Sequence, residues 1–265
     1  MIETSAPALR WQDYVALYRA AVNRLRSEEA YRAFQAQQAQ MLVRYLRAHG
    51  VEPAGRLLVD LGSGLGGYSL LFAQEGARVI SIDLMADKIR PQGQDQSAYQ
   101  AVGASAQAVP LAGNSVEMVF CASLIEHVPD PAAALREIRR VLVPGGICYL
   151  SFPPFYSWRG GHEYAPYHYL GEKMALRLVG EGAKKYHPDW IQEIYQVEQT
   201  PDSFAGIYAD WGLYVMTVGK AQRLIAQTPL TLLDMSTRYM PMSFIRWPLL
   251  GEVLTWHAQF LLRKD

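Results

Sequence analysis

A glycine-rich stretch, VDLGSGLGGYS at residues 59–69, constrains the fold of this chain more than any other part of the sequence. It follows an apolar run, RLLV, and leads into the apolar segment YSLLFAQEG. Gly62, Gly64 and Gly67 satisfy the pattern G-x-G-x-x-G, in which glycines permit a tight turn and let the backbone approach a ligand closely. The stretch therefore predicts a strand, a ligand-binding turn and a helix.

The segments beyond this stretch alternate between predicted strands and helices. The predicted strands are ARVISID, a short one near residues 99–102, VEMVFCAS and ICYLSF, and the helix PAAALREIRRVL begins after the capping residue Asp130. A helix at GKAQRLIAQ, a strand around LTLLDMS and a last strand at EVLTWHAQFLLRK follow. This alternation predicts an α/β fold with a mostly parallel sheet, helices on both faces and a ligand crevice at the carboxyl ends of the strands.

Four regions are expected along the chain. Residues 1–54 form an N-terminal helical cap, because the stretch from 9 to 49 has no proline or glycine and its apolar residues recur at helical spacing. Residues 55–153 form the binding core. Residues 154–215, where aromatic residues, prolines, glycines and histidines follow no sustained period, form an inserted lid and acceptor region, and residues 216–265 add a helix and the closing strands.

Charge and cysteine content narrow the class of protein. The 265 residues carry 25 basic and 25 acidic side chains, a formal net charge of +0, so a nucleic-acid backbone is a poor candidate partner. Cys121 and Cys148 lie in apolar runs, which favours buried thiols and a reducing compartment. We find no secretory signal at the N-terminus and no transmembrane segment, and we expect a cytoplasmic protein.

Asp60, just before the first glycine, distinguishes between the ligands that such a loop accepts. Its carboxylate would repel a pyrophosphate, since two like charges about 4 Å apart cost roughly 4 kcal/mol at a surface-type dielectric. The same carboxylate would attract an ammonium group. Asp83, about 20 residues after the loop, is suited to grip ribose hydroxyls. S-adenosylmethionine, with adenosine at one end and a charged amino acid at the other, satisfies both, although an aspartate before the turn can also simply cap the helix.

Longer stretches resemble a known family. LLVDLGSGLGGYSLLFAQEGARVISID and AQAVPLAGNSVEMVFCASLIEHVPDPAAALREIRRVLVPGGICYLSFP resemble, in order, the motifs of the class I S-adenosylmethionine-dependent methyltransferases of the UbiE-like, type 11 group. The resemblance covers roughly residues 55–153, and LTWHAQFLLRK resembles the family's antiparallel last strand. It implies a Rossmann-like fold with a mostly parallel seven-stranded sheet and an antiparallel last strand.

The resemblance also implies cofactor-binding residues. The methionine part would be held by Asp60 and the loop residues Gly62, Ser63, Gly64 and Gly66. Asp83 would accept hydrogen bonds from the ribose hydroxyls, Leu84 would lie against adenine, and Ser105 and Ala106 would border the adenine amino edge. Many relatives have an acidic residue where Ser105 stands, which weakens that contact here. Cys121 and Ala122 would line the methyl-donor end.

Three histidines are candidates for the acceptor side. His127, in LIEHVPD after the fourth predicted strand, is placed at the crevice mouth, and His162 and His168 belong to RGGHEYAPYHYLG in the lid. Each is a candidate general base, yet His127 can instead support its loop, and the lid cluster can instead pack the lid onto the sheet. Glu126 is expected to be structural. The spacing of His162 and His168 matches no metal-site pattern, so no metal is predicted.

These observations predict an S-adenosylmethionine-dependent methyltransferase that acts on a small-molecule or lipid-like acceptor. One alternative is an NAD(P)-dependent oxidoreductase, which the glycine pattern permits and Asp60 opposes. The other is a regulatory protein that binds S-adenosylmethionine without turnover. The acceptor, the methylated atom and the oligomeric state are not predicted.

Overall fold

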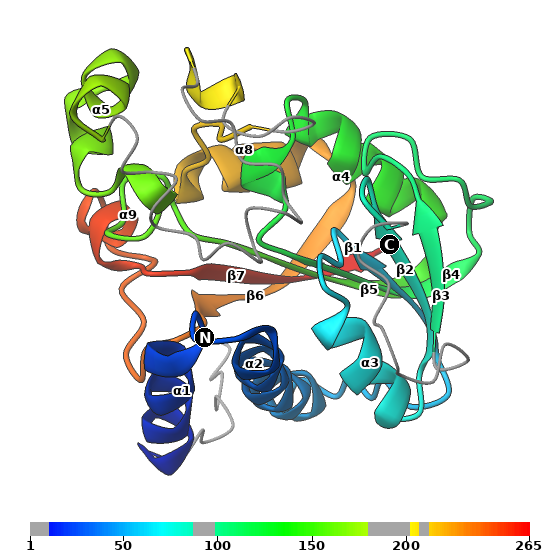
Figure 1. The fold of residues 1–265 in the computed structure, drawn as a ribbon. Coiled ribbons are helices and arrows are strands. Elements are labelled where there is room, and N and C mark those ends of the chain that lie inside the picture. Colours follow the sequence, from blue (N-terminus) through cyan, green and yellow to red (C-terminus); the bar gives the residue numbers. More distant parts are fainter. Residues whose placement is uncertain (1–10, 87–98, 180–201, 207–211) are drawn as a thin grey trace.

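The computed structural model describes residues 11–86, 99–179, 202–206 and 212–265. Its centre is a seven-stranded sheet with the order β3-β2-β1-β4-β5-β7-β6 (Figure 1). The strands are β1 (Leu57–Leu61), β2 (Arg78–Asp83), β3 (Tyr99–Gly103), β4 (Val116–Ala122), β5 (Leu142–Phe152), β6 (Leu230–Thr237) and β7 (Ala258–Lys264). The first five strands pair in parallel, and β7 is antiparallel to both β5 and β6. The predicted sheet, with its antiparallel last strand, is confirmed.

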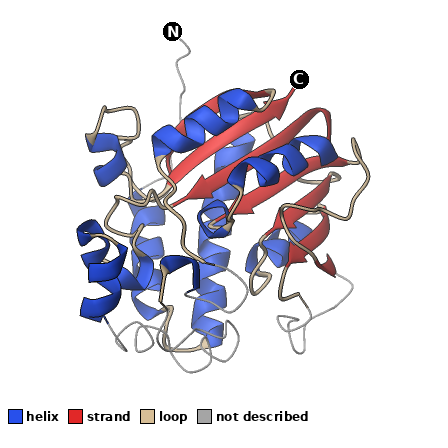
Figure 2. Ribbon diagram, turned by 90° about the horizontal axis from the view of Figure 1, so that it is seen from above, coloured by secondary structure: helices blue, strands red, loops and turns tan. Residues whose placement is uncertain are grey.

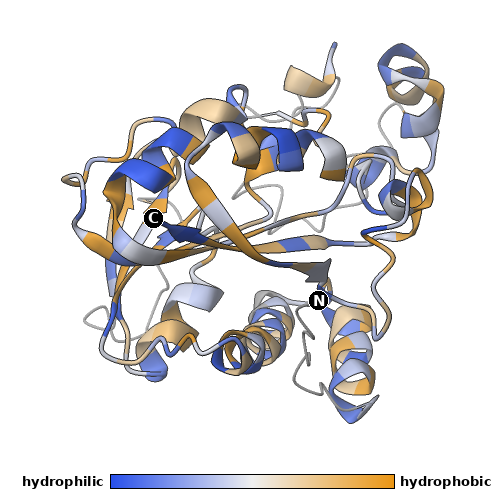
Figure 3. Ribbon diagram, turned by 180° about the vertical axis from the view of Figure 1, so that it is seen from behind, coloured by the Kyte–Doolittle hydropathy of each residue, from blue (hydrophilic) through white to orange (hydrophobic). Residues whose placement is uncertain are grey.

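Helices cover both faces of this sheet (Figures 1 and 2). On one face lie α1 (Trp11–Asn23), α2 (Glu28–Ala48) and α3 (Gly67–Gln74), and on the other lie α4 (Pro131–Val141) and α8 (Val218–Gln227). Each face has its own core: Leu46 and Phe72 pack below the sheet, and Ile138 and Ile225 pack above it. The strands carry much of the hydrophobic colour in Figure 3, as expected for a sheet that is buried on both sides.

Local signals set several helix boundaries. Asp130 caps α4 as predicted, with its Oδ1 accepting a hydrogen bond from the Ala133 amide at 3.0 Å. Ser27 caps α2 in the same way, through the Ala30 amide at 3.1 Å, and it separates α2 from α1. The expectation of two or more helices before residue 50 is therefore confirmed.

Two predicted strands differ in their bounds. β5 begins at Leu142, five residues before ICYLSF, and a register shift opposite Val116 accommodates the Pro-Gly-Gly segment within the strand. The last strand begins only at Ala258, because the preceding residues form the short helix α9 (Leu250–Leu254). The Glu252 side chain in this helix accepts hydrogen bonds from two backbone amides at the start of α8.

The region between β5 and α8 contains short helices where the structure describes it. These are the 3-10 helices η2 (His162–Tyr164), η3 (Tyr167–Leu170) and η4 (Phe204–Gly206), and the helix α5 (Glu172–Val179). Phe155, Tyr164 and Phe204 pack together as a separate small core. Residues 180–201 and 207–211 of the predicted lid lie outside the described residues. Among the helices that are described, none has both the length and the apolar character needed to cross a bilayer.

Candidate active site

The glycine loop joins β1 to α3 at the carboxyl edge of the sheet. Gly62, Gly64 and Gly66 all have positive φ, at 76°, 50° and 74°, which explains why glycine is needed at these positions. The Gly62 amide donates to the Ile82 carbonyl at 2.7 Å, and Ser63, which is buried, donates from its amide to the same carbonyl at 3.3 Å. The loop is thus fastened to the neighbouring strand β2.

Packing around the loop leaves no room for a Cβ on Gly62 or Gly66 unless a neighbouring side chain moves. A Cβ on Gly62 would lie 2.8 Å from Leu124, and one on Gly66 would lie 2.5 Å from the Tyr99 hydroxyl. Gly66 is also the N-cap of α3, whose first amides have no earlier carbonyl in the helix to bind. The backbone of the loop can therefore approach a ligand closely, as a nucleoside-binding turn requires.

Asp60 lies beneath the loop near the end of β1. It is only 1% exposed, and its carboxylate accepts a hydrogen bond from the Ser69 hydroxyl of α3 at 2.5 Å. Burial raises the pKa of Asp60 to about 7, the bond from Ser69 opposes this shift, and the charge of Asp83 adds to it. An ammonium group bound beside this carboxyl group would favour its charged form and lower that pKa.

Asp83 is the last residue of β2 and is half-buried. Its Oδ2 accepts from the Gly64 amide at 3.0 Å, and its Oδ1 accepts from the Met85 amide at 2.9 Å. Leu84, between them, is 52% exposed, so its side chain is available to lie against a planar group. Asp60 and Asp83 come from the paired strands β1 and β2, and their side chains contact α3 and the loop, respectively.

The other predicted cofactor-binding residues lie just after β3 or at the end of β4. The Ser105 hydroxyl accepts a hydrogen bond from the Gln107 amide at 3.2 Å, and Ala106 is buried. Cys121 is completely buried in the core under α4. Its thiol therefore faces the core, and only its backbone is available to a ligand at the end of β4. Ala122 is half-buried beside it.

A serine and a histidine that sequence reasoning missed lie just beyond β4. Ser123 has a positive φ of 52°, a conformation that costs energy for a residue with a Cβ. Its hydroxyl lies 3.0 Å from Nε2 of His257, which precedes β7. The residues are far apart in the sequence, and only the antiparallel return of β7 beside β5 brings them together.

Two of the three candidate histidines converge. His127 ends η1 (Ile125–His127), and its ring centroid is 4.9 Å from that of His162 in the lid. His127 Nδ1 lies 2.7 Å from the Gly212 carbonyl, and since a carbonyl only accepts, Nδ1 carries the proton and Nε2 bears the lone pair. Burial lowers the pKa of His127 to about 3, the charge of His162 lowers it further, and the Gly212 bond opposes the shift.

Glu126 belongs to the same cluster. It is 1% exposed, burial raises its pKa to about 8, and its Oε1 lies 3.9 Å from His127 Nε2. One ligand atom from each of Glu126, His127 and His162 fits within 4.8 Å of the others, which is compatible with a shared metal ion. Sequence spacing missed this set because His162 is brought in by the lid.

His168 lies apart from this cluster. It is 2% exposed, its ring packs edge-on against Phe155 with centroids 5.4 Å apart, and it lies against Tyr169 at 4.0 Å. A Cβ on Gly161 would collide with the His168 ring, so the two segments of the lid are in close contact. This environment favours a packing role for His168.

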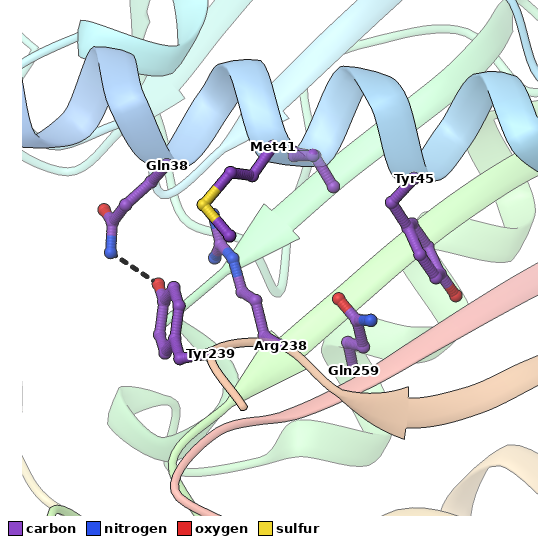
Figure 4. A pocket seen from close by; sticks show the side chains of 7 residues that line it. Gln38, Met41, Tyr45, Arg238, Tyr239 and Gln259 are labelled. Carbon is purple, nitrogen blue, oxygen red and sulfur yellow. Dashed lines mark hydrogen bonds between the residues drawn. The ribbon is translucent and has the colours of Figure 1, made fainter. Parts of the chain in front are cut away.

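A small pocket of about 20 Å³ lies between α2 and the strands β6 and β7 (Figure 4). Its lining residues are Gln38, Met41, Leu42, Tyr45, Arg238, Tyr239 and Gln259. The buried Arg238 guanidinium donates to the Tyr68 hydroxyl at 2.6 Å and stacks on the ring of Tyr239, while Gln38 donates to the Tyr239 hydroxyl. Arg238 thereby connects the end of β6 with the first turn of α3.

The fold and the arrangement of this site define a class. A seven-stranded sheet of this order, with a glycine loop after β1 and an acidic residue ending β2, is the class I S-adenosylmethionine-dependent methyltransferase fold. The solved structure of such a methyltransferase from Mesorhizobium loti aligns with a TM-score of 0.54 and 20% identity, covering 83% of this chain and 95% of that one. At this identity the likeness shows the fold alone.

Sequence comparisons then establish the family. The methyltransferase domain family matches residues 59–150. An uncharacterized methyltransferase of Mycobacterium avium is 37% identical over 178 residues, which span 64% of this chain and 70% of that protein. One of Mycobacterium leprae is 33% identical over 156 residues, or 58% of each chain, so the match spans little more than half of that relative. This chain belongs to the methyltransferase family.

Proposed function

We propose that this protein transfers the methyl group of S-adenosylmethionine to a small-molecule or lipid-like acceptor. The observation that carries the proposal is the pair of carboxylates on β1 and β2: Asp60 buried below the glycine loop, and Asp83 bonded to its Gly64 amide at 3.0 Å. A carboxylate on each side of the loop suits a ligand with an ammonium group and a ribose, and disfavours a diphosphate. Family membership supports the same cofactor.

The residues present fit this cofactor. The close-packed glycines form a cradle without side chains, and we infer that the backbone of Gly62, Ser63, Gly64 and Gly66 binds the methionine part together with Asp60. Asp83 is at the position for the ribose, with Leu84 and the Ser105–Ala106 segment on the adenine side. The cofactor supplies an electrophilic methyl group. The chain's contribution is to hold donor and acceptor in line and to exclude water.

We place the acceptor at the carboxyl ends of β4 and β5, below the described part of the lid. His127, His162 and Ser123 lie at or just beyond this edge, and the aromatic residues Phe155 and Tyr164 are close by in the lid core. A few polar groups beside this buried aromatic core suit an uncharged or weakly charged organic acceptor. The near-neutral composition of the chain agrees with that choice.

Titration calorimetry with S-adenosylmethionine and, separately, with NAD tests the cofactor. We expect binding of S-adenosylmethionine only, and binding of NAD alone would overturn the proposal. Transfer of a radiolabelled methyl group to small-molecule and lipid extracts then tests turnover. A protein that binds the cofactor yet labels nothing in either extract would be a regulatory binder rather than an enzyme.

The proton-transfer role of the three histidines is tested by separate variants. His127→Ala, His162→Ala and His168→Ala each remove one candidate base. General-base catalysis contributes about 10²- to 10⁴-fold, so loss of an essential base lowers kcat by that factor. A folded variant with unaltered kcat excludes the base role for that residue.

A further inference from the structure

The cluster at the start of the lid combines three side chains that are typical metal ligands. Glu126 and His127 come from η1 just after β4, and His162 comes from η2. One ligand atom from each lies within 4.8 Å of the other two. In a tetrahedral zinc site with bonds of about 2.0 to 2.1 Å, neighbouring ligand atoms are about 3.3 Å apart, so small side-chain movements would bring all three to one ion.

The Glu126 carboxylate is the strongest indication of a missing cation. The residue is 1% exposed, and neither carboxylate oxygen has a hydrogen-bond partner among the described residues. The Nε2 atom of His127 lies 3.9 Å from Glu126 Oε1. A buried carboxyl group without a partner is costly, and a positive ion between these two atoms would favour its charged form and bind it.

His127 is already oriented as a ligand. Its Nδ1 proton is committed to the Gly212 carbonyl at 2.7 Å, which leaves Nε2 as the atom with a lone pair facing Glu126. Histidines that bind metals usually donate their other ring N–H to a carbonyl or carboxylate in this manner. The Glu126 carbonyl also accepts from the Tyr214 amide at 2.8 Å, so residues 212–214 hold both the backbone of Glu126 and the ring of His127.

We propose that Glu126, His127 and His162 bind one divalent transition-metal cation, with zinc as the best fit. Two imidazoles and one carboxylate form a three-ligand set that leaves an open coordination position, which is the arrangement of catalytic rather than closed structural zinc sites. Ligation uses the lone pair of His127 Nε2, so this assignment replaces the general-base role for that histidine. Metal binding itself does not depend on the proposed methyl transfer.

Zinc binding to the full chain tests the proposal directly. The protein is stripped with EDTA, dialysed and titrated with ZnCl₂ by calorimetry, and bound zinc is counted by mass spectrometry. We expect one zinc ion per chain. Replacement of zinc by Co²⁺ should give the visible absorption of a low-coordinate cobalt site. This spectrum can be recorded without an activity assay.

Matched variants locate the ion. Glu126→Gln keeps the shape of the side chain and His162→Ala removes a lid ligand, and each should weaken zinc binding by at least about tenfold. His168→Ala is the control, because this buried lid histidine lies outside the set, and zinc affinity should stay unchanged. Circular dichroism reports folding. If His162→Ala unfolds, Glu126→Gln decides.

Three results would overturn the proposal: no stoichiometric zinc, zinc affinity unchanged in folded Glu126→Gln, or binding of Mg²⁺ but not zinc. Titration of the same preparations with S-adenosylmethionine separates this inference from the proposed function. Cofactor binding without zinc binding defeats the metal site alone, and zinc binding without cofactor binding defeats the methyltransferase assignment alone.

Discussion

The Asp83 carboxylate holds the glycine loop in place, because the Gly64 amide donates to its Oδ2 at 3.0 Å while the Met85 amide donates to its Oδ1 at 2.9 Å. Asp83, the last residue of β2, thus orders the glycine loop through its side chain. A ribose bound at this position would meet a carboxylate that is already oriented, which lowers the cost of ordering the site on binding.

Asp83→Ala should weaken S-adenosylmethionine binding by about 1 to 3 kcal/mol, through loss of hydrogen bonds to a charged acceptor. Calorimetry measures the affinity. Ser27→Ala is a suitable control, since it removes the exposed cap at the start of α2 and should lower only stability. Equal affinity of the Asp83 variant and the unmodified protein would place the ribose elsewhere.

Asp60 makes stability depend on pH. Its pKa in the folded protein is raised from 3.8 to about 7, mainly by burial, so the folded state retains a proton that the unfolded state loses. Its contribution is complete below about pH 4 and disappears as pH rises to about 7. We expect Asp60→Asn to flatten this part of the stability curve, measured by urea unfolding between pH 4 and 8. Parallel curves for the two proteins would contradict the shift.

Alanine substitutions at Gly62 and Gly55 distinguish the cost of backbone strain from the cost of steric overlap. Both have φ near +77°, but a Cβ on Gly62 would lie 2.8 Å from Leu124, whereas nothing lies within 4 Å of one on Gly55. Gly55→Ala should cost about 1 to 2 kcal/mol from its left-handed backbone alone. Gly62→Ala should lower the free energy of unfolding by more than this and should also weaken cofactor binding. Thermal melts measure the first effect and calorimetry the second. Equal destabilisation by the two variants would mean that the Leu124 side chain moves aside without cost.

Glu252 couples α9 to the start of α8. Its two carboxylate oxygens accept from the amides of Val218 and Gly219 at 2.8 and 2.9 Å. Glu252→Ala should destabilise the fold by about 1.5 to 3 kcal/mol, because it leaves helix N-terminal amides without their charged acceptor. Glu252→Gln retains one acceptor oxygen, so its melting temperature should lie between the other two. Identical melting of all three proteins would argue against this cap.

Local patterns were sufficient for the core of the fold. The turn glycines and the apolar runs on either side of them predicted β1, α3 and β2, and Asp130 with Pro131 predicted the start of α4. The strand predicted for EVLTW was wrong because this short run is as compatible with a strand as with a helix. Its contact with α8, through Glu252, is distant in sequence.

The proposed acceptor side shows the limit of predictions from local sequence patterns. The sequence predicts a base role for His127, but the neighbours of this residue depend on how the segment that contains His162 packs against η1. Glu126 and His162 do not stand at a spacing that metal motifs use. The contact of Ser123 with His257 likewise requires β7 to lie beside β5. The periodicity of apolar residues within a segment does not predict contacts between side chains that are far apart in the sequence.

The position of β7 between β5 and β6 has a consequence for synthesis on the ribosome. A nascent chain completes β6 before β7 has been translated, yet β7 is the only strand with which β6 pairs in this sheet. Until β7 emerges, β5 and β6 both present unpaired backbone groups that can recruit other polypeptides. Chaperone protection of this late intermediate would therefore matter more for the yield of folded protein than protection of the earlier glycine-loop half.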